Sequence, residues 1–214
     1  MADLNLADQH PALAAARDAL VREFSGVFDE GTIARFVADS YERLSSRPHE
    51  ERTLPEATER LARQRLQALA RVEEKDTNEV PIVLFMCVHN AGRSQMALGW
   101  FNHLAGDAAV AWSGGSEPGS QVNPAAVAAM AEVGIDIARE FPKPWTEETV
   151  RAADVVVTMG CGDACPFFPG TRYEDWELDD PHGQGIEAVR PIRDEIERRV
   201  RTLLAELGVV TSSH

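Results

Sequence analysis

The second part of this 214-residue chain alternates short apolar runs with helical stretches, and this pattern restricts the possible folds most strongly. The run at residues 81–86 is continuous and apolar, and residues 154–159 contain three consecutive valines at 155–157; both patterns are typical of parallel strands buried on both faces. Weaker strand patterns fall at residues 108–112 and 173–178, and helical patterns fall at 92–104, 124–133 and 186–207. The alternation predicts an α/β domain over residues 80–210, built on a doubly wound parallel four-stranded sheet.

Residues 1–75 have a different pattern, because three helical stretches follow one another without strand patterns between them. They cover about residues 11–24, a stretch that follows Asp29, and residues 55–72. Asp29 is a suitable N-cap, and Pro55 suits the first position of a helix. The sequence therefore predicts a small three-helix module, joined to the α/β domain by a polar linker at residues 73–79.

Charge and composition argue against several classes of protein. The net charge of −14 disfavours non-specific nucleic-acid binding, which needs a basic surface. The chain has no run of 18 apolar residues, so we expect no membrane span, and its first residues lack the pattern of a secretion signal. Without such a signal, we expect the three cysteines to be reduced thiols and the protein to be cytoplasmic.

The loop between the first strand and the first helix of the α/β domain carries the clearest chemical motif, Cys87-x5-Arg93-Ser94. Ligands bind at the carboxyl ends of strands in such sheets, and the first turn of a helix offers unpaired N–H groups to an anion. Ala91 and Gly92 are small enough to let the backbone approach an anion, and the Arg93 guanidinium matches an oxyanion. Positive surroundings favour the thiolate of Cys87, so we predict an oxyanion site with a cysteine nucleophile.

This loop resembles that of the low-molecular-weight tyrosine phosphatases, and more closely that of the thioredoxin-linked arsenate reductases built on the same fold. Four stretches match the reductases: residues 93–97 (RSQMA), 113–118 (SGGSEP), 122–124 (VNP) and 176–181 (WELDDP). The resemblance covers about residues 81–208 and does not extend to the N-terminal helices.

The resemblance implies a role for the residues of the loop and for one aspartate outside it. Cys87 would attack the arsenic atom of arsenate, and Asp180 would protonate the departing oxygen as general acid. Asp179 would be a partner of Asp180 or a cap. Ser94 would hydrogen-bond the Cys87 sulfur, and Asn90 would brace the loop. The oxyanion would be held by the loop residues Val88, His89, Asn90, Ala91, Gly92, Arg93 and Ser94.

Two further cysteines, Cys161 and Cys165, follow the strongest strand pattern and so belong to the same edge of the sheet as Cys87. A phosphatase has no use for them, whereas a reductase must supply two electrons. Cys161 would attack the Cys87–arsenic adduct and release arsenite, and Cys165 would then move the disulfide to Cys161–Cys165. The alternatives are a zinc half-site, for which no second pair of ligands is present, or two incidental loop cysteines. The resemblance implies no bound cofactor and thioredoxin as electron donor, with mycothiol and its redoxin as the alternative.

The sequence departs from the family pattern at several positions. The spacing Cys161-x3-Cys165 is shorter than usual, which leaves open which thiol acts first. His89 replaces a glycine, and it either adds positive charge or serves the backbone of the loop. Leu98 replaces a glutamate tied to a potassium site, so we expect no potassium there. Residues 182–185 lack the aromatic wall of a phosphotyrosine pocket.

Two other functions and one assembly remain to be tested. The chain could hydrolyse phosphomonoesters, such as tyrosine phosphate, or it could be an oxyanion sensor with the helical module as effector. The apolar positions Ile33, Phe36, Val37 and Tyr41 suit a self-complementary interface, so we expect a homodimer through the N-terminal helices. The alternative is that these residues only form the core of the module.

Overall fold

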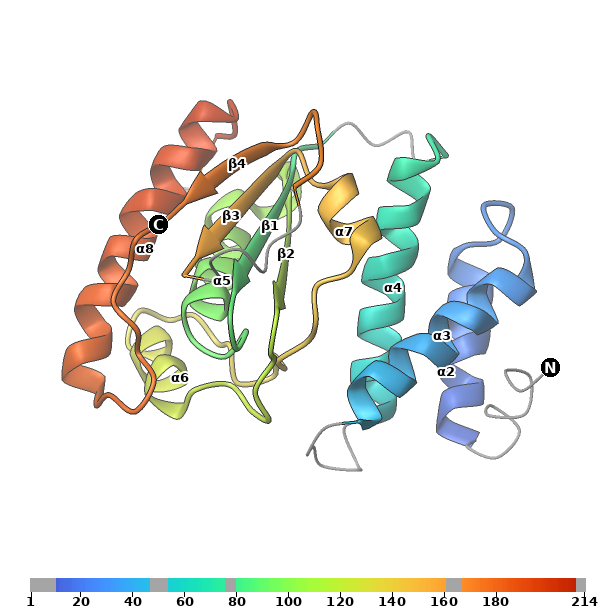
Figure 1. Cartoon of the computed structure of the whole chain (residues 1–214), viewed down its shortest axis with the longest axis horizontal. Helices are drawn as coiled ribbons and strands as arrows, with labels where there is room; N and C mark the ends of the chain where they lie inside the picture. Colours follow the sequence, from blue (N-terminus) through green and yellow to red (C-terminus); the bar gives the residue numbers. More distant parts are fainter. Residues whose placement is uncertain (1–10, 47–53, 76–79, 161–166, 211–214) are drawn as a thin grey trace. The chain divides into compact units, whose positions relative to one another are not determined.

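The computed structural model describes residues 11–46, 54–75, 80–160 and 167–210. The chain divides into two compact units, Met1–Thr77 and Asn78–His214. We describe each unit separately, starting with the helical one (Figure 1).

The first unit consists of the predicted helices, which span Pro11–Glu23 (α2), Glu30–Ser45 (α3) and Leu54–Val72 (α4). Asp29 caps α3 as expected, because its side chain accepts a hydrogen bond of 2.9 Å from the Thr32 N–H. The apolar faces of the helices meet in a core formed by Leu20, Phe24, Ile33, Val37, Ala62 and Leu66. The helical module expected from the sequence is therefore confirmed.

The apolar face of α3 packs mainly into this core. Ile33 is fully buried and Val37 is 4% exposed within the core, so these two residues are not available to a second subunit. Phe36 is half-buried, and the Arg65 guanidinium lies 4.8 Å from the centre of its ring. Of the four positions expected at a dimer interface, only Phe36 and Tyr41 keep part of their surface exposed.

The second unit contains the predicted parallel four-stranded sheet, and its strand order is β2-β1-β3-β4. The strands span Ile82–Cys87 (β1), Val110–Gly115 (β2), Val155–Met159 (β3) and Arg172–Asp175 (β4). Cys87 pairs with Gly115 on one side and with Met159 on the other, so three carboxyl ends lie level. The chain runs outward from β1 to β2 and then returns to β3, and ligands bind at such a switch point in open α/β sheets.

Helices cover both faces of this sheet (Figure 1). Three of them lie on one side, namely Arg93–Ala105 (α5), Pro124–Ala131 (α6) and Ile186–Glu206 (α8), and Glu147–Ala152 (α7) lies on the other. Among the described residues, no helix is long and apolar enough to cross a membrane.

The sequence patterns misplaced some boundaries. Residue 108 belongs to a short 3-10 helix, Gly106–Ala108, and not to β2, which begins at Val110. The fourth strand ends at Asp175 and not at residue 178, because its neighbour β3 runs only one residue past the position that pairs with Asp175. The short helix α7 was missed, and it begins with a capping box formed by Thr146 and Thr149.

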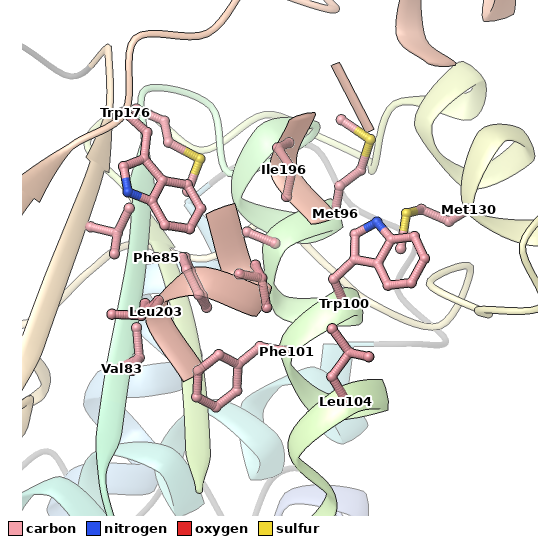
Figure 2. Packing of buried hydrophobic residues seen from close by; sticks show 14 of the residues in the cluster. Val83, Phe85, Met96, Trp100, Phe101, Leu104, Met130, Trp176, Ile196 and Leu203 are labelled. Atoms are coloured by element: carbon pink, nitrogen blue, oxygen red, sulfur yellow. The ribbon is translucent and has the colours of Figure 1, made fainter. Parts of the chain in front are cut away.

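The core of the second unit fixes the position of Cys87. Val83, Phe85 and Cys87 alternate along β1 and therefore point to the same face of the sheet. The Phe85 ring lies 5.7 Å from that of Phe101 and 5.8 Å from that of Trp176. Figure 2 shows the side chains that fill the space between the sheet and the helices, including Met96, Trp100, Leu104, Met130, Ile196 and Leu203. Cys87 thus ends a row of tightly packed residues and cannot shift without disturbing them.

An ion pair on the surface joins α6 to α8. Arg190 donates hydrogen bonds of 2.6 and 2.9 Å to the Glu132 carboxylate, and Arg193 adds one of 3.1 Å. The bonds from Arg190 lower the pKa of Glu132 to about 2, so this carboxylate stays charged in mildly acidic as well as neutral solution. The contact holds the helix that begins just after Asn123, a residue of the site described next.

Candidate active site

The buried thiol of Cys87 lies at the end of β1, where the chain enters the loop of residues 88–92. Helix α5 follows directly and begins at Arg93, so its first turn faces the same place. The Cys87 sulfur lies 3.0 Å from the Ser94 hydroxyl oxygen, within hydrogen-bond distance. This contact stabilises a thiolate when the hydroxyl donates to the sulfur.

Asn90 holds the loop in shape. It is fully buried and adopts a left-handed backbone conformation with a φ of 46°, which asparagine tolerates better than most residues. Its amide donates a hydrogen bond of 2.8 Å to the Ser94 hydroxyl, and its side-chain oxygen accepts bonds from the Gln95 side chain (3.1 Å) and the Lys143 N–H (3.0 Å). Asn90 therefore connects the loop, the first turn of α5 and the segment at residue 143.

Backbone hydrogen bonds determine which way the loop faces. The carbonyl groups of Val88, His89 and Ala91 accept bonds of 2.8–2.9 Å from N–H groups of the segment at residues 117–123. In a planar trans peptide, a carbonyl points opposite to the N–H of the next residue. The N–H groups of residues 89, 90 and 92 therefore point away from that segment, into the concave side of the loop, where they can bind an anion.

Arg93 is 8% exposed, and its guanidinium covers one side of this concave surface. It donates a hydrogen bond of 3.4 Å to the Leu178 carbonyl and lies 3.5 Å from a carboxylate oxygen of Asp180. Gly160, which follows β3, approaches so closely that an added Cβ would lie 3.1 Å from the guanidinium, and its φ is 77°. The end of β3 thus borders the anion site.

The segment that carries Asp180 packs directly over the loop. A Cβ at Gly92 would lie 2.6 Å from a ring carbon of Pro181, so only glycine permits this contact. The Asn123 side chain donates a hydrogen bond of 2.9 Å to the Pro181 carbonyl, and its oxygen caps α6. Asp180 is exposed and lies beside the Arg93 guanidinium, and Asp179 is also exposed.

Cys87, Arg93 and Asp180 line one pocket of about 580 Å³. His89 and His182 also line it, with ring centres 5.8 Å apart, and His89 Nδ1 lies 3.1 Å from the Glu117 carbonyl oxygen. The rest of the wall is formed by Ala91, Gly92, Gly119, Ser120, Gln121, Asn123, Pro124, Ala125, Pro181, Gly183 and Gln184.

The residues expected to bind the oxyanion therefore differ in position. His89, Ala91, Gly92 and Arg93 line the pocket, whereas the Val88 carbonyl and the side chains of Asn90 and Ser94 support the loop from behind through the bonds described above. Cys161 and Cys165 lie outside the described residues.

The sequence analysis assigned no role to three residues that shape the loop, although Gln95 and Gly115 lie in stretches that match the reductases. Gln95 is fully buried and donates hydrogen bonds to the Asn90 and Phe141 carbonyls, and a Cβ at Gly115 would lie 2.6 Å from the Val88 carbonyl oxygen. Lys143 is 4% exposed, and its ammonium donates a hydrogen bond of 3.1 Å to the Ser113 hydroxyl. Such residues carry no periodic signal, although a lysine between two prolines is an unusual context that could have drawn attention to Lys143.

Residues 82–211 match the family described as low molecular weight phosphotyrosine protein phosphatase. The chain belongs to this family. Residues 13–70 match a second family, described as the N-terminal domain of protein-tyrosine-phosphatase-like proteins. The N-terminal helices therefore match a domain that is described for phosphatase-like proteins.

Several relatives within this fold are named arsenate reductases. The arsenate reductase of Bacillus subtilis is 41% identical over 140 residues, which are 61% of this chain and 99% of that protein. The glutaredoxin arsenate reductase of Synechocystis is 38% identical over 129 residues, which are 59% of this chain and 98% of that protein. The resemblance to the arsenate reductases of this fold is thus confirmed.

One solved structure matches almost the whole chain. It is a thioredoxin-dependent arsenate reductase of Corynebacterium glutamicum, with a TM-score of 0.83 and 40% identity, and the match covers 93% of this chain and 98% of that one. A tyrosine phosphatase of Erwinia amylovora, at 17% identity and a TM-score of 0.54, shares the fold alone.

The contact between Gly92 and Pro181 gives a prediction for anion binding. The substitution Gly92→Ala should weaken the binding of inorganic phosphate by about tenfold, roughly 1.4 kcal/mol, because the new methyl group displaces Pro181 and distorts the loop. Isothermal titration calorimetry measures the change. Gly185→Ala is the matched control, because an added Cβ there meets no atom within 4 Å. Unchanged phosphate affinity in Gly92→Ala would contradict this account of the site.

Proposed function

We propose that this enzyme reduces arsenate to arsenite, with Cys87 as the nucleophile. The observation that carries the proposal is the meeting of the Cys87 thiol, the Arg93 guanidinium and the Asp180 carboxyl in one pocket, beside inward-facing N–H groups of the loop. Relatives in sequence and in structure are named arsenate reductases, which supports arsenate as the oxyanion that this site takes as substrate.

In the first step, the Cys87 thiolate attacks the arsenic atom and forms a sulfur–arsenic bond. The loop N–H groups and Arg93 bind the remaining oxygens and stabilise their charge. Asp180 donates a proton to the departing oxygen, which leaves as water. Its position beside Arg93, at 3.5 Å, suits this role, because the departing oxygen lies on the side of arsenic opposite the thiolate.

In the second step, Cys161 supplies the electrons together with Cys87. The Cys161 thiolate attacks the Cys87 sulfur, the sulfur–arsenic electron pair stays on arsenic as arsenite leaves, and a Cys87–Cys161 disulfide forms. Cys165 then attacks the Cys161 sulfur and releases the Cys87 thiolate. The strand register supports this order of steps, because Cys87 pairs with Met159 and Cys161 follows Met159 by only two residues in the chain.

We propose thioredoxin as the donor that reduces the final disulfide, because the Corynebacterium glutamicum enzyme, which matches both units, is thioredoxin-dependent. The Synechocystis relative is named for glutaredoxin, and mycothiol with a redoxin is a third donor of the same chemistry. The proposed relay needs no bound cofactor or metal ion, and it fits the reducing conditions of the cytoplasm.

Hydrolysis of tyrosine phosphate is the alternative activity of this fold. The composition of the pocket weighs against it, because no Phe, Tyr or Trp is among the described residues that line the pocket. A phosphotyrosine ring would meet only the smaller imidazole rings of His89 and His182, and no large apolar aromatic surface on which to stack. Two assays of the purified protein separate the two activities. The first measures arsenate reduction in the presence of thioredoxin, thioredoxin reductase and NADPH, and the second measures hydrolysis of para-nitrophenyl phosphate.

The role of Cys87 predicts the effect of its replacement. Cys87→Ser should lower arsenite formation by at least about a thousandfold, because a hydroxyl in this site does not ionise as a thiol does. Circular dichroism should show an unchanged fold, since the two side chains have nearly the same shape. A rate within tenfold of the unmodified enzyme would remove Cys87 from the mechanism.

The relay predicts a trapped intermediate. Arsenate added to reduced Cys165→Ser protein should accumulate a Cys87–Cys161 disulfide, because the thiol that resolves it is absent. Peptide mapping by mass spectrometry identifies the linked peptides, and thioredoxin should reduce this disulfide poorly. Cys87 joined only to a small thiol would support the mycothiol mechanism, and full activity of Cys161→Ser with thioredoxin would contradict the cascade.

We further propose that the enzyme is a homodimer joined through its N-terminal helices at the surface around Phe36 and Tyr41. Phe36→Glu should convert the dimer to a monomer at micromolar concentration, because a buried carboxylate at the interface is unfavourable. Light scattering measures the mass, and Arg35→Glu, next to it on the exposed side of α3, is the control. A monomeric unmodified protein under these conditions would contradict the proposal.

A further inference from the structure

Two large apolar side chains are strongly exposed among the described residues, Phe167 (73%) and Val210 (88%). A single exposed apolar residue is common in proteins and by itself indicates nothing. Phe167 differs from Val210 in two ways, because it is held by neighbouring side chains and because it follows Cys165 by two residues.

Phe167 belongs to a small group of aromatic residues that we call the aromatic platform, formed by Phe167, Phe168 and Tyr173. The Phe167 ring stacks on that of Tyr173, with centres 5.0 Å apart and planes inclined by 30°. The Phe168 N–H donates a hydrogen bond of 2.9 Å to the Tyr173 hydroxyl, and the Arg151 guanidinium lies 5.9 Å from the Phe168 ring centre. The exposed ring is therefore already ordered, which reduces the entropy lost when a partner covers it.

The charged side chains beside the platform are paired with one another. Arg151 lies 3.3 Å from a carboxylate oxygen of Glu147, and Arg172, next to Tyr173, pairs with Glu174 and Glu206. These five side chains, two arginines and three glutamates, carry a net charge of only −1 in a chain whose net charge is −14. A partner would recognise it through apolar contact and not through charge.

We infer that the aromatic platform is the docking surface for the dithiol protein that reduces the Cys161–Cys165 disulfide, an inference that rests on the proposed relay. Exchange requires a partner sulfur to bond to Cys161 or Cys165, and two residues span at most about 7.6 Å between Cα atoms. A protein thiol that reaches Cys165 therefore brings its surrounding surface over Phe167. The fitting partner is a protein dithiol of the thioredoxin type, the donor on which the similar Corynebacterium glutamicum enzyme depends.

The exchange itself balances without another reactant. The partner's thiolate attacks one sulfur of the disulfide, forms a mixed disulfide and releases the other sulfur as a thiolate. The partner's second thiol then displaces the remaining cysteine, so that the partner is oxidised by two electrons and both cysteines are reduced. A small dithiol such as dithiothreitol performs the same exchange without using the platform.

The experiment compares Phe167→Ser with Val210→Ser in the steady-state reduction of arsenate. With thioredoxin as donor, Phe167→Ser should raise the KM for thioredoxin about tenfold with little change in kcat, because a central apolar contact is lost. With dithiothreitol as donor, its rate should equal that of the unmodified enzyme. Val210→Ser removes a side chain of similar exposure and should behave as the unmodified enzyme with both donors. Phe167→Trp should retain the low KM, because it keeps an aromatic surface.

Three outcomes would overturn the inference. The first is an unchanged KM for thioredoxin in Phe167→Ser. The second is a parallel loss of rate with thioredoxin and dithiothreitol, which would show that Phe167 only supports the local structure. In both cases the unmodified enzyme still reduces arsenate, so the proposed function survives. The third, an unmodified enzyme that gives no arsenite with either donor, would overturn the proposed function as well.

Discussion

The hydrogen bonds of Asn90 are the interaction on which the rest of the site depends. This buried side chain holds a left-handed turn in the anion loop and joins it to Ser94, to Gln95 and to the backbone of Lys143. If these bonds were lost, the Ser94 hydroxyl would lose the partner that orients it, and Cys87 would lose its neighbour at 3.0 Å. A buried polar group of this kind stabilises a structure only when all its partners are present, so the loop has one defined shape.

The walls of the pocket are held to this loop by close contacts that require small residues. Gly92 permits the approach of Pro181, Gly115 permits the approach of the Val88 carbonyl, and Gly160 lies against Arg93. Each contact brings a different strand end or segment to the anion loop. Asp180, the N–H groups of the loop and the end of β3 thus meet around Cys87. A site fixed in this way is ready for the transition state before arsenate binds.

The substrate and the protein reductant of the proposed reaction need different kinds of surface. Arsenate needs a small concave surface with N–H donors and a guanidinium, and the loop after β1 provides it. A protein reductant needs an accessible apolar surface next to the terminal disulfide, and the stacked rings of Phe167 and Tyr173 offer one. A relay through Cys161 and Cys165 would connect these two places, so the buried nucleophile need never contact the reductant.

The sequence by itself determined the fold class, the helical module and the chemical motif. Buried parallel strands such as β1 require continuous apolar runs, and amphipathic helices require a period of 3.6 residues, so both leave a local signal. Cys87, Arg93 and Ser94 were found because their spacing within one loop is local too. The limits of β4 and the helix α7 were misjudged, because the length of a strand depends on its neighbour and a helix of 6 residues is too short to show a period.

The tertiary structure decided which residues assemble around the loop. Lys143, Gly115 and Asn123 come from distant parts of the chain and contact the loop only through the register of β2 and the path of the segments after it. It also decided that Ile33 and Val37 belong to the core of their own unit. Burial and contact between distant residues depend on packing in three dimensions, and a pattern along one segment cannot contain that information.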